Sequence, residues 1–191
     1  MIGAYAPVLE ILNDLEKKYF GVRLPYCPEK MHAFREEKQK VKFPPEPMPE
    51  YFFALSQRCG IGAFYINIEG KYIELSSTNY MSFYGPSVFS HTSNKHSNLL
   101  YTKCSQLYEA AMQESDPELL LQKLGIFFWV NCQAKLWSKG EPAIGEMIIR
   151  AVLASKGLKF SGWKLGIIPW VEVFKYIDGN EFGKNFKNLL Q

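Results

Sequence analysis

Cysteine pairs and catalytic signatures are missing from this sequence, and their absence narrows the functional classes. The four cysteines stand far apart, without a CxxC pair, at Cys27, Cys59, Cys104 and Cys132. This spacing favours reduced, mostly buried thiols over a zinc site or a disulfide framework. The chain also has no P-loop, GxSxG, HExxH or dinucleotide-binding motif, and no secretory signal opens it. We therefore expect a cytoplasmic protein with no cofactor and no metal site.

A strong charge excess and a long apolar run are also missing. The 22 basic residues are nearly balanced by 19 acidic ones, giving a net charge of +3, and no dense basic stripe or RNA-binding motif is present, so we expect no nucleic-acid partner. The longest apolar stretch, residues 119–137, is interrupted by charged and amide side chains such as Lys123, Asn131 and Lys135. A bilayer-spanning helix needs about 18 residues with few or no charges. We therefore predict a buried helix here and no membrane partner.

Overall composition is that of a folded domain. Hydrophobic residues make up 47% and charged residues 21% of the 191 positions, which fits one domain over residues 1–191 with a sizeable core. Aromatic residues are the one excess, at 15%. They are explained either by core packing or by an aromatic-lined pocket or docking surface.

The spacing of hydrophobic residues changes several times in the first half of the chain. An apolar stripe after Pro7 predicts a helix, and residues 29–40 predict a polar surface helix. Four prolines in residues 43–49 predict an extended strap, and a short helix is expected from 49 to 58. Residues 61–75, with Glu69 and Gly70 between two β-favouring runs, predict a β-hairpin.

A long polar loop is predicted at residues 76–98. The stretch has no clear period and collects Ser, Thr, Asn and His side chains. Long polar loops in compact domains are often functional, but an ordinary surface loop explains this one equally well.

The second half of the chain is predicted to be helical. Helices are expected at 99–114, at 117–137, where Asp116 caps the start and Pro117 occupies the first turn, and at 142–156, which Gly157 ends. Two short helices follow, at 169–177 and 181–190, with a turn at 178–180. The predicted fold class is therefore α+β, mainly α, with a helical core around the apolar helix 117–137 and one small hairpin at 61–75.

The two central helices and their joint resemble the helical core of the Fic/Doc family over residues 116–163, including the stop at Gly157 and the following Trp163. In that family one helix leads into a glycine-rich loop, and the amides at the start of the next helix hold nucleotide phosphates. The resemblance therefore implies a similar helical core and, for the activity, a transferase that modifies a protein side chain.

The family signature is largely replaced in this chain. Of the aligned motif only Gly140 is kept. Ala134 and Leu136 replace the catalytic histidine and the phenylalanine, Glu141 and Pro142 replace the loop asparagine and the second glycine, and Ala143 and Glu146 replace the two arginines. Pro142 removes a backbone donor, and the two carboxylates repel an anion. Ser138 and Glu141 are also spaced as a helix capping box, which needs no chemistry.

Two functional hypotheses follow. The favoured one is a non-enzymatic protein-interaction domain with a protein partner, and the resemblance to Fic-type proteins implies a bacterial effector or toxin-related protein, with delivery to a host cytosol as an alternative location. The other is a transferase on a degenerate Fic-like fold. The candidate recognition or pocket residues are the same in both: Asn79, His91, His96, Trp137, Lys139 and Glu141. The histidines titrate near neutrality, so they suit either proton transfer or hydrogen bonding to a partner.

Overall fold

The computed structural model describes residues 51–56, 61–79, 88–92, 94–136, 140–176 and 178–191. The chain divides into two compact units, Met1–Ser90 and His91–Gln191, and each is described by itself below. The predicted helix after Pro7, the polar helix at 29–40 and the proline strap at 43–49 lie outside the described residues. The single domain over residues 1–191 stays a prediction.

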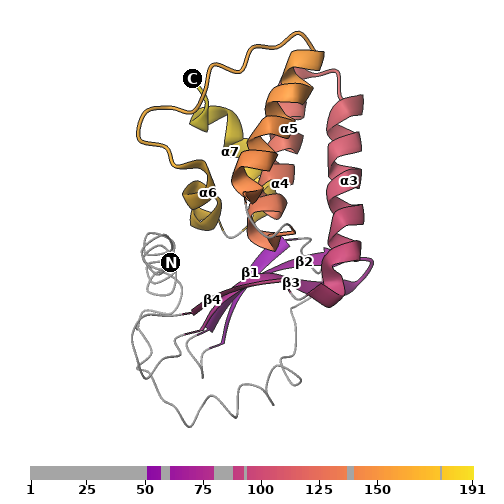
Figure 1. Ribbon diagram of the computed structural model, residues 1–191, viewed down its shortest axis with the longest axis vertical. Coiled ribbons are helices and arrows are strands. Elements are labelled where there is room, and N and C mark those ends of the chain that lie inside the picture. Colours follow the sequence, from indigo (N-terminus) through magenta and orange to yellow (C-terminus); the bar gives the residue numbers. More distant parts are fainter. Residues whose placement is uncertain (1–50, 57–60, 80–87, 93, 137–139, 177) are drawn as a thin grey trace. The chain divides into compact units, whose positions relative to one another are not determined.

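A four-stranded sheet is built from strands in chain order (Figure 1). The strands are β1 (Tyr51–Ser56), β2 (Ile61–Ile68), β3 (Lys71–Asn79) and β4 (Val88–His91). Strands β2 and β3 are antiparallel, with Ile66 opposite Ile73, and both side chains are buried. Glu69 and Gly70 between them have φ values of 53° and 77°, as a two-residue type I′ turn requires. The predicted hairpin is therefore confirmed.

Strand β1 corrects the short helix expected at residues 49–58. All six residues from Tyr51 to Ser56 pair antiparallel with Ile61 to Ile66 of β2. A stretch this short carries too little period to separate a helix from a strand. Its aromatic residues favour a strand once a partner strand is present, so pairing across the sheet decided the outcome.

Regular elements also replace much of the predicted polar loop at 76–98. Residues 76–79 continue β3, because β2 extends far enough to pair with them, as in the pairing of Asn79 with Ile61. Strand β4 follows at Val88–His91, then a short 3-10 helix, η2 (Asn94–His96). The expected loop is therefore wrong in these parts, while residues 80–87 and 93 lie outside the described residues.

The second unit is helical, as the sequence predicted, so the fold class is α+β and mainly α. Its helices are α3 (Ser97–Gln113), α4 (Pro117–Ala134), α5 (Glu141–Ser155), α6 (Pro169–Glu172) and α7 (Gly179–Asn185). The 3-10 turns η3 (Val173–Lys175) and η4 (Phe186–Leu189) extend α6 and α7. The expected turn at 178–180 is a helix start instead, where Asp178 accepts a hydrogen bond from the Asn180 amide.

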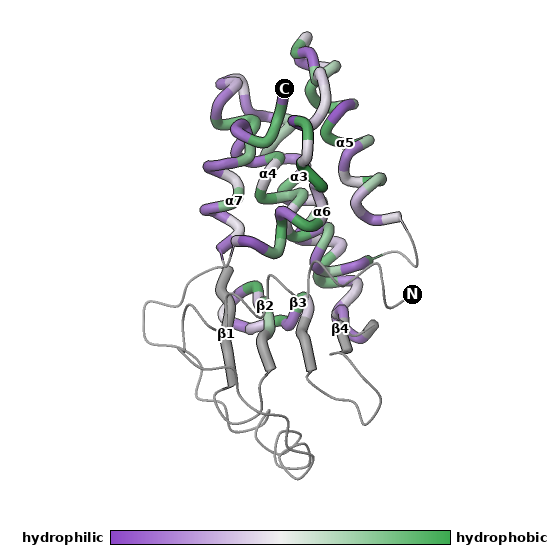
Figure 2. The backbone as a smooth tube through the Cα atoms, turned by 90° about the vertical axis from the view of Figure 1, so that its left-hand side faces the viewer, coloured by the Kyte–Doolittle hydropathy of each residue, from purple (hydrophilic) through white to green (hydrophobic). Residues whose placement is uncertain are grey.

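Helix α4 forms the core of this unit. Asp116 caps it by accepting a hydrogen bond of 2.8 Å from the Leu119 amide, as predicted, and Pro117 begins the first turn. Leu124, Phe128 and Trp129 are fully buried, and Figure 2 shows the hydrophobic residues, in green, concentrated along this helix. α4 ends at Ala134 rather than at 137, because Lys135 takes a left-handed conformation with φ 48°.

Two glycines let α7 pack closely against α4. A Cβ atom at Gly125 would lie 2.6 Å from the Phe186 Cβ, and one at Gly183 would lie 2.7 Å from the Gln122 carbonyl oxygen. Nearby, the Trp129 indole donates a 3.3 Å hydrogen bond to the Tyr176 carbonyl. This side of α4 is therefore filled by helix packing. Among the described helices, none is long and apolar enough to cross a membrane.

Candidate recognition site on the helical unit

The joint between α4 and α5 ends with a left-handed glycine. Gly140 is the N-cap of α5, with φ 87°, and its carbonyl accepts a 2.9 Å hydrogen bond from the Ile144 amide. No side chain caps this helix. The expected Ser138–Glu141 capping box is therefore corrected: Glu141 is the first helical residue, and Ser138 lies outside the described residues.

Two buried polar residues, Asn131 and Glu141, meet where α4 joins α5. The Asn131 Nδ2 atom donates a 2.7 Å hydrogen bond to the Glu141 backbone carbonyl. A Cβ atom at Gly145, one turn further along α5, would lie 2.9 Å from that same Nδ2. The missing side chain at Gly145 therefore allows the two helices to meet at this hydrogen bond.

Two acceptor oxygens at this joint have no hydrogen-bond partner in the part of the chain that the structure describes. They are the Glu141 Oε1 and the Asn131 Oδ1, and only 6% of Glu141 is exposed. A buried acceptor oxygen without a donor is destabilising. Both oxygens are closed off from solvent, so a partner at the surface of the joint does not reach them.

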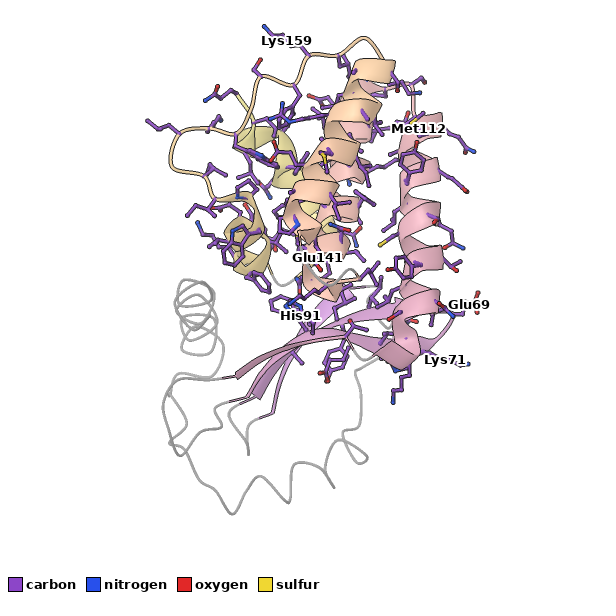
Figure 3. The ribbon with its side chains drawn as sticks, viewed as in Figure 1. Glu69, Lys71, His91, Met112, Glu141 and Lys159 are labelled. Atoms are coloured by element: carbon purple, nitrogen blue, oxygen red, sulfur yellow. The ribbon has the colours of Figure 1, made fainter. Side chains whose placement is uncertain are left out.

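His91 reaches the same end of α4. Its Nδ1 lies 3.0 Å from the Gln133 carbonyl oxygen; because a carbonyl only accepts, the proton of this hydrogen bond is on Nδ1. Burial lowers the pKa of His91, the hydrogen bond to Gln133 partly opposes that change, and nearby Lys135 lowers the pKa further. Figure 3 shows His91 and Glu141 at the same end of the helical unit. At neutral pH this histidine is therefore an uncharged, oriented ring.

None of the contacts described at this joint involves the other predicted site residues. Asn79 is the last residue of β3, and His96 is the N-cap of α3 without a side-chain capping bond. Trp137 and Lys139 lie outside the described residues. Their role in recognition stays a prediction, as does that of His91 and Glu141.

The Cys132 thiol beside Glu141 is not poised for chemistry. Burial raises its pKa well above the ordinary range, and the negative charge of Glu141 raises it further. Glu146, in the next turn of α5, is held by structural contacts: its Oε1 accepts from Arg150 and its Oε2 accepts a 2.8 Å hydrogen bond from the Trp163 indole. Both groups stabilise the fold.

A second surface, which the sequence did not predict, lies where α3 and α5 flank α4. An apolar hollow of about 320 Å³ opens there, and we call it the α3–α5 groove; it is lined by Tyr101, Cys104, Ser105, Tyr108, Phe127, Ile148 and Ala151. The two tyrosines are 37% and 39% exposed. Tyr101 is fixed by a 2.6 Å hydrogen bond from its hydroxyl to the Leu136 carbonyl.

The sequence carried a partial signal for this groove. Tyr101, Ser105 and Tyr108 recur at helical spacing along α3, next to the stripe that contacts α4. The structure leaves Tyr108 on the rim of the groove. A single helix cannot show that the facing surface of α5 stays uncovered, so the groove itself needed the tertiary structure.

A comparison with protein families gives the affiliation of the chain. Residues 67–191 match the model of the AvrB_AvrC family, described as avirulence protein. The chain belongs to this avirulence family. The match spans more than half of the sequence and includes every helix of the second unit. A comparison with curated proteins finds no match.

Membership of the AvrB_AvrC family corrects the expected resemblance to the Fic/Doc family. The matching model belongs to the avirulence proteins and spans residues 116–163, on which that resemblance depended. The pattern of two apolar helices joined at a glycine was too general to distinguish families. The avirulence affiliation indicates a bacterial effector.

Proposed function

We propose that this avirulence protein is an effector that binds a host protein in the host cytosol without modifying it covalently. The family affiliation supports the effector role. The observation that carries the binding role is the α3–α5 groove, an apolar hollow with exposed tyrosines on its rim.

The chemistry of the groove suits a protein anchor. Tyrosines contribute large, rigid contact areas and are enriched where binding energy concentrates. A hollow of about 320 Å³ accommodates an aromatic or long aliphatic side chain, and the tyrosine hydroxyls can hydrogen-bond to the edge of the partner. We expect an apolar anchor of the host protein to enter between Tyr108 and Ile148.

The thiols that the structure describes do not support covalent chemistry. Burial raises the pKa of Cys104, on the groove wall, to about 12, and Cys132 is likewise held as a thiol. A thiol with so high a pKa is a poor nucleophile at neutral pH. Binding of a partner in the groove, by contrast, requires no reactive thiol.

The α4–α5 joint is the second part of the proposed recognition surface. We assign Glu141 and His91 to this surface on the basis of the sequence; the unpaired oxygens of Glu141 and Asn131 are closed off from solvent, so a partner does not reach them. Asn79, His96, Trp137 and Lys139 stay proposed recognition residues on the grounds given by the sequence.

The test blocks the groove with one substitution. Ala151 lines the groove, whereas Ala154 lies on the same helix, is exposed and does not line it. Arginine is a good helix former, so Ala151→Arg and Ala154→Arg should both fold. Wild type and both variants are used to capture proteins from host cytosol. The captured proteins are identified, and their intact masses are measured.

We expect the Ala151→Arg variant to lose a partner that wild type and the Ala154→Arg variant retain. The mass of that partner should equal its mass before capture. Equal capture by all three proteins would reject the groove as the binding surface, and a mass increase that requires the wild-type protein would reject the non-enzymatic role.

A further inference from the structure

The segment between α5 and α6, residues 156–168, presents large apolar side chains to solvent. Leu165 is 100% exposed and Ile168 is 49% exposed. The turn that carries Leu165 is closed by a 3.0 Å hydrogen bond from the Ile167 amide to the Lys164 carbonyl, and Gly166 has φ 83°. A positive φ at this position is typical of a type II turn. The fold therefore holds Leu165 at the tip of a defined turn.

Strong anchors fix this segment, so the exposure is not the result of a loose chain. The Trp163 indole donates to Glu146, and its ring lies 5.5 Å from the Phe128 ring, centroid to centroid. The Lys164 amide donates a 2.9 Å hydrogen bond to the Leu189 carbonyl. Trp163 thus faces the core, while Leu165 and Ile168 are left outside it.

The charged residues in this part of the sequence have one sign. Between Glu146 and Glu172 the sequence contains no acidic residue and four basic ones: Arg150, Lys156, Lys159 and Lys164. The three lysines are exposed. In Figure 1 the segment runs as an extended coil outside the helices, and Figure 3 shows Lys159 pointing away from them. The segment therefore combines exposed apolar side chains with exposed lysines.

We propose that residues 156–168 adsorb to the surface of an anionic lipid bilayer. Leu165 and Ile168 would enter the headgroup region, and the three lysines would face the anionic headgroups. A combination of apolar burial and attraction to anionic lipid is how peripheral segments bind membranes. The tip is convex, so a partner must supply the concavity, and a fluid bilayer does so without a matched pocket.

This proposal is independent of the α3–α5 groove and of the proposed host-protein binding. It also differs from the sequence-based expectation of no membrane partner. That expectation depended on the lack of a spanning segment, and adsorption to a surface requires no spanning helix.

The test is co-sedimentation of the full chain with vesicles. One set contains phosphatidylcholine alone, and the other contains about 30% phosphatidylserine. The main variant combines Leu165→Ser and Ile168→Ser. Its matched control combines Leu119→Ser and Met147→Ser, which remove two other exposed apolar side chains, 49% and 61% exposed. Lys164→Glu is compared with Lys95→Glu, an equal charge change on an exposed lysine of η2.

We expect binding to the phosphatidylserine vesicles alone, weakened by salt. Loss of the two apolar side chains should weaken it about tenfold, and Lys164→Glu should weaken it more than Lys95→Glu does. Absence of binding by wild type would overturn the proposal, as would equal binding by the main variant and its control. Equally tight binding to soluble polyglutamate, with the same dependence on Leu165, would assign the segment to an acidic protein and would also overturn it.

Discussion

The side chain of Asn131 donates a 2.7 Å hydrogen bond to the backbone carbonyl of Glu141, and this contact joins the end of α4 to the start of α5. The same two residues carry the acceptor oxygens that lack partners in the described part of the chain. One pair of residues therefore both fixes the joint and carries two buried acceptor oxygens that lack a donor in the described residues.

Replacing Glu141 with glutamine should stabilise the isolated protein. One oxygen of the Glu141 side chain is buried without a donor in the described residues, and glutamine supplies an amide of the same shape that can donate to a neighbouring acceptor, so we expect a gain in the free energy of unfolding of about 1–2 kcal/mol. Urea unfolding measures it. Glu118→Gln is the control, because Glu118 is a surface carboxylate paired with Lys187 and should change stability little. A clear loss of stability in Glu141→Gln would show that the carboxylate has a stabilising partner.

Replacing Gly125 with alanine should destabilise the helical unit. Alanine normally stabilises a helix relative to glycine by about 1 kcal/mol, but here the new Cβ would lie 2.6 Å from the Phe186 Cβ. We expect a net loss of about 1–3 kcal/mol from the forced separation of α4 and α7. Thermal unfolding followed by circular dichroism measures the change. A rise in Tm would mean that the two helices are further apart than described.

His91 should make folding stability depend on pH below neutrality. Burial lowers its pKa in the folded protein from the ordinary 6.5, so the unfolded chain binds a proton more readily. The stabilising contribution is therefore complete above pH 6.5 and is lost as the pH falls through that value toward the folded pKa. Unfolding midpoints of wild type and His91→Asn, compared across this range, should converge as the pH falls. A difference between the two unfolding midpoints that stays constant with pH would refute the assignment of this pH dependence to His91.

Cys104 and Cys132 should resist thiol reagents in the folded protein. Both are free and buried, and burial raises the pKa of Cys104 to about 12. In a variant with Cys27→Ser and Cys59→Ser, we expect slow labelling at pH 8 that becomes complete in denaturant. In the unaltered chain, denaturant should reveal four free thiols, as the dispersed cysteines predict. Fast labelling of the folded variant would indicate an accessible thiolate.

The sequence by itself determined the elements whose signals are local. Asp116 with Pro117 marked the start of α4, Gly157 marked the end of α5, and Glu69 with Gly70 marked the hairpin turn, because capping and positive φ depend on a few adjacent residues. The apolar periodicity of residues 97–155 was long enough to identify three helices. The mainly helical α+β class followed from these signals.

The tertiary structure decided what depends on distant partners. Tyr51–Ser56 became a strand because β2 lies beside it, and Tyr108 became a rim residue because α3 and α5 leave a groove over α4. The local pattern is the same whether or not a neighbour covers it, so burial and pairing could not be predicted there. For the same reason, the sequence identified Glu141 as a candidate, but only the packing of Asn131 against it showed a buried carboxylate in need of a donor.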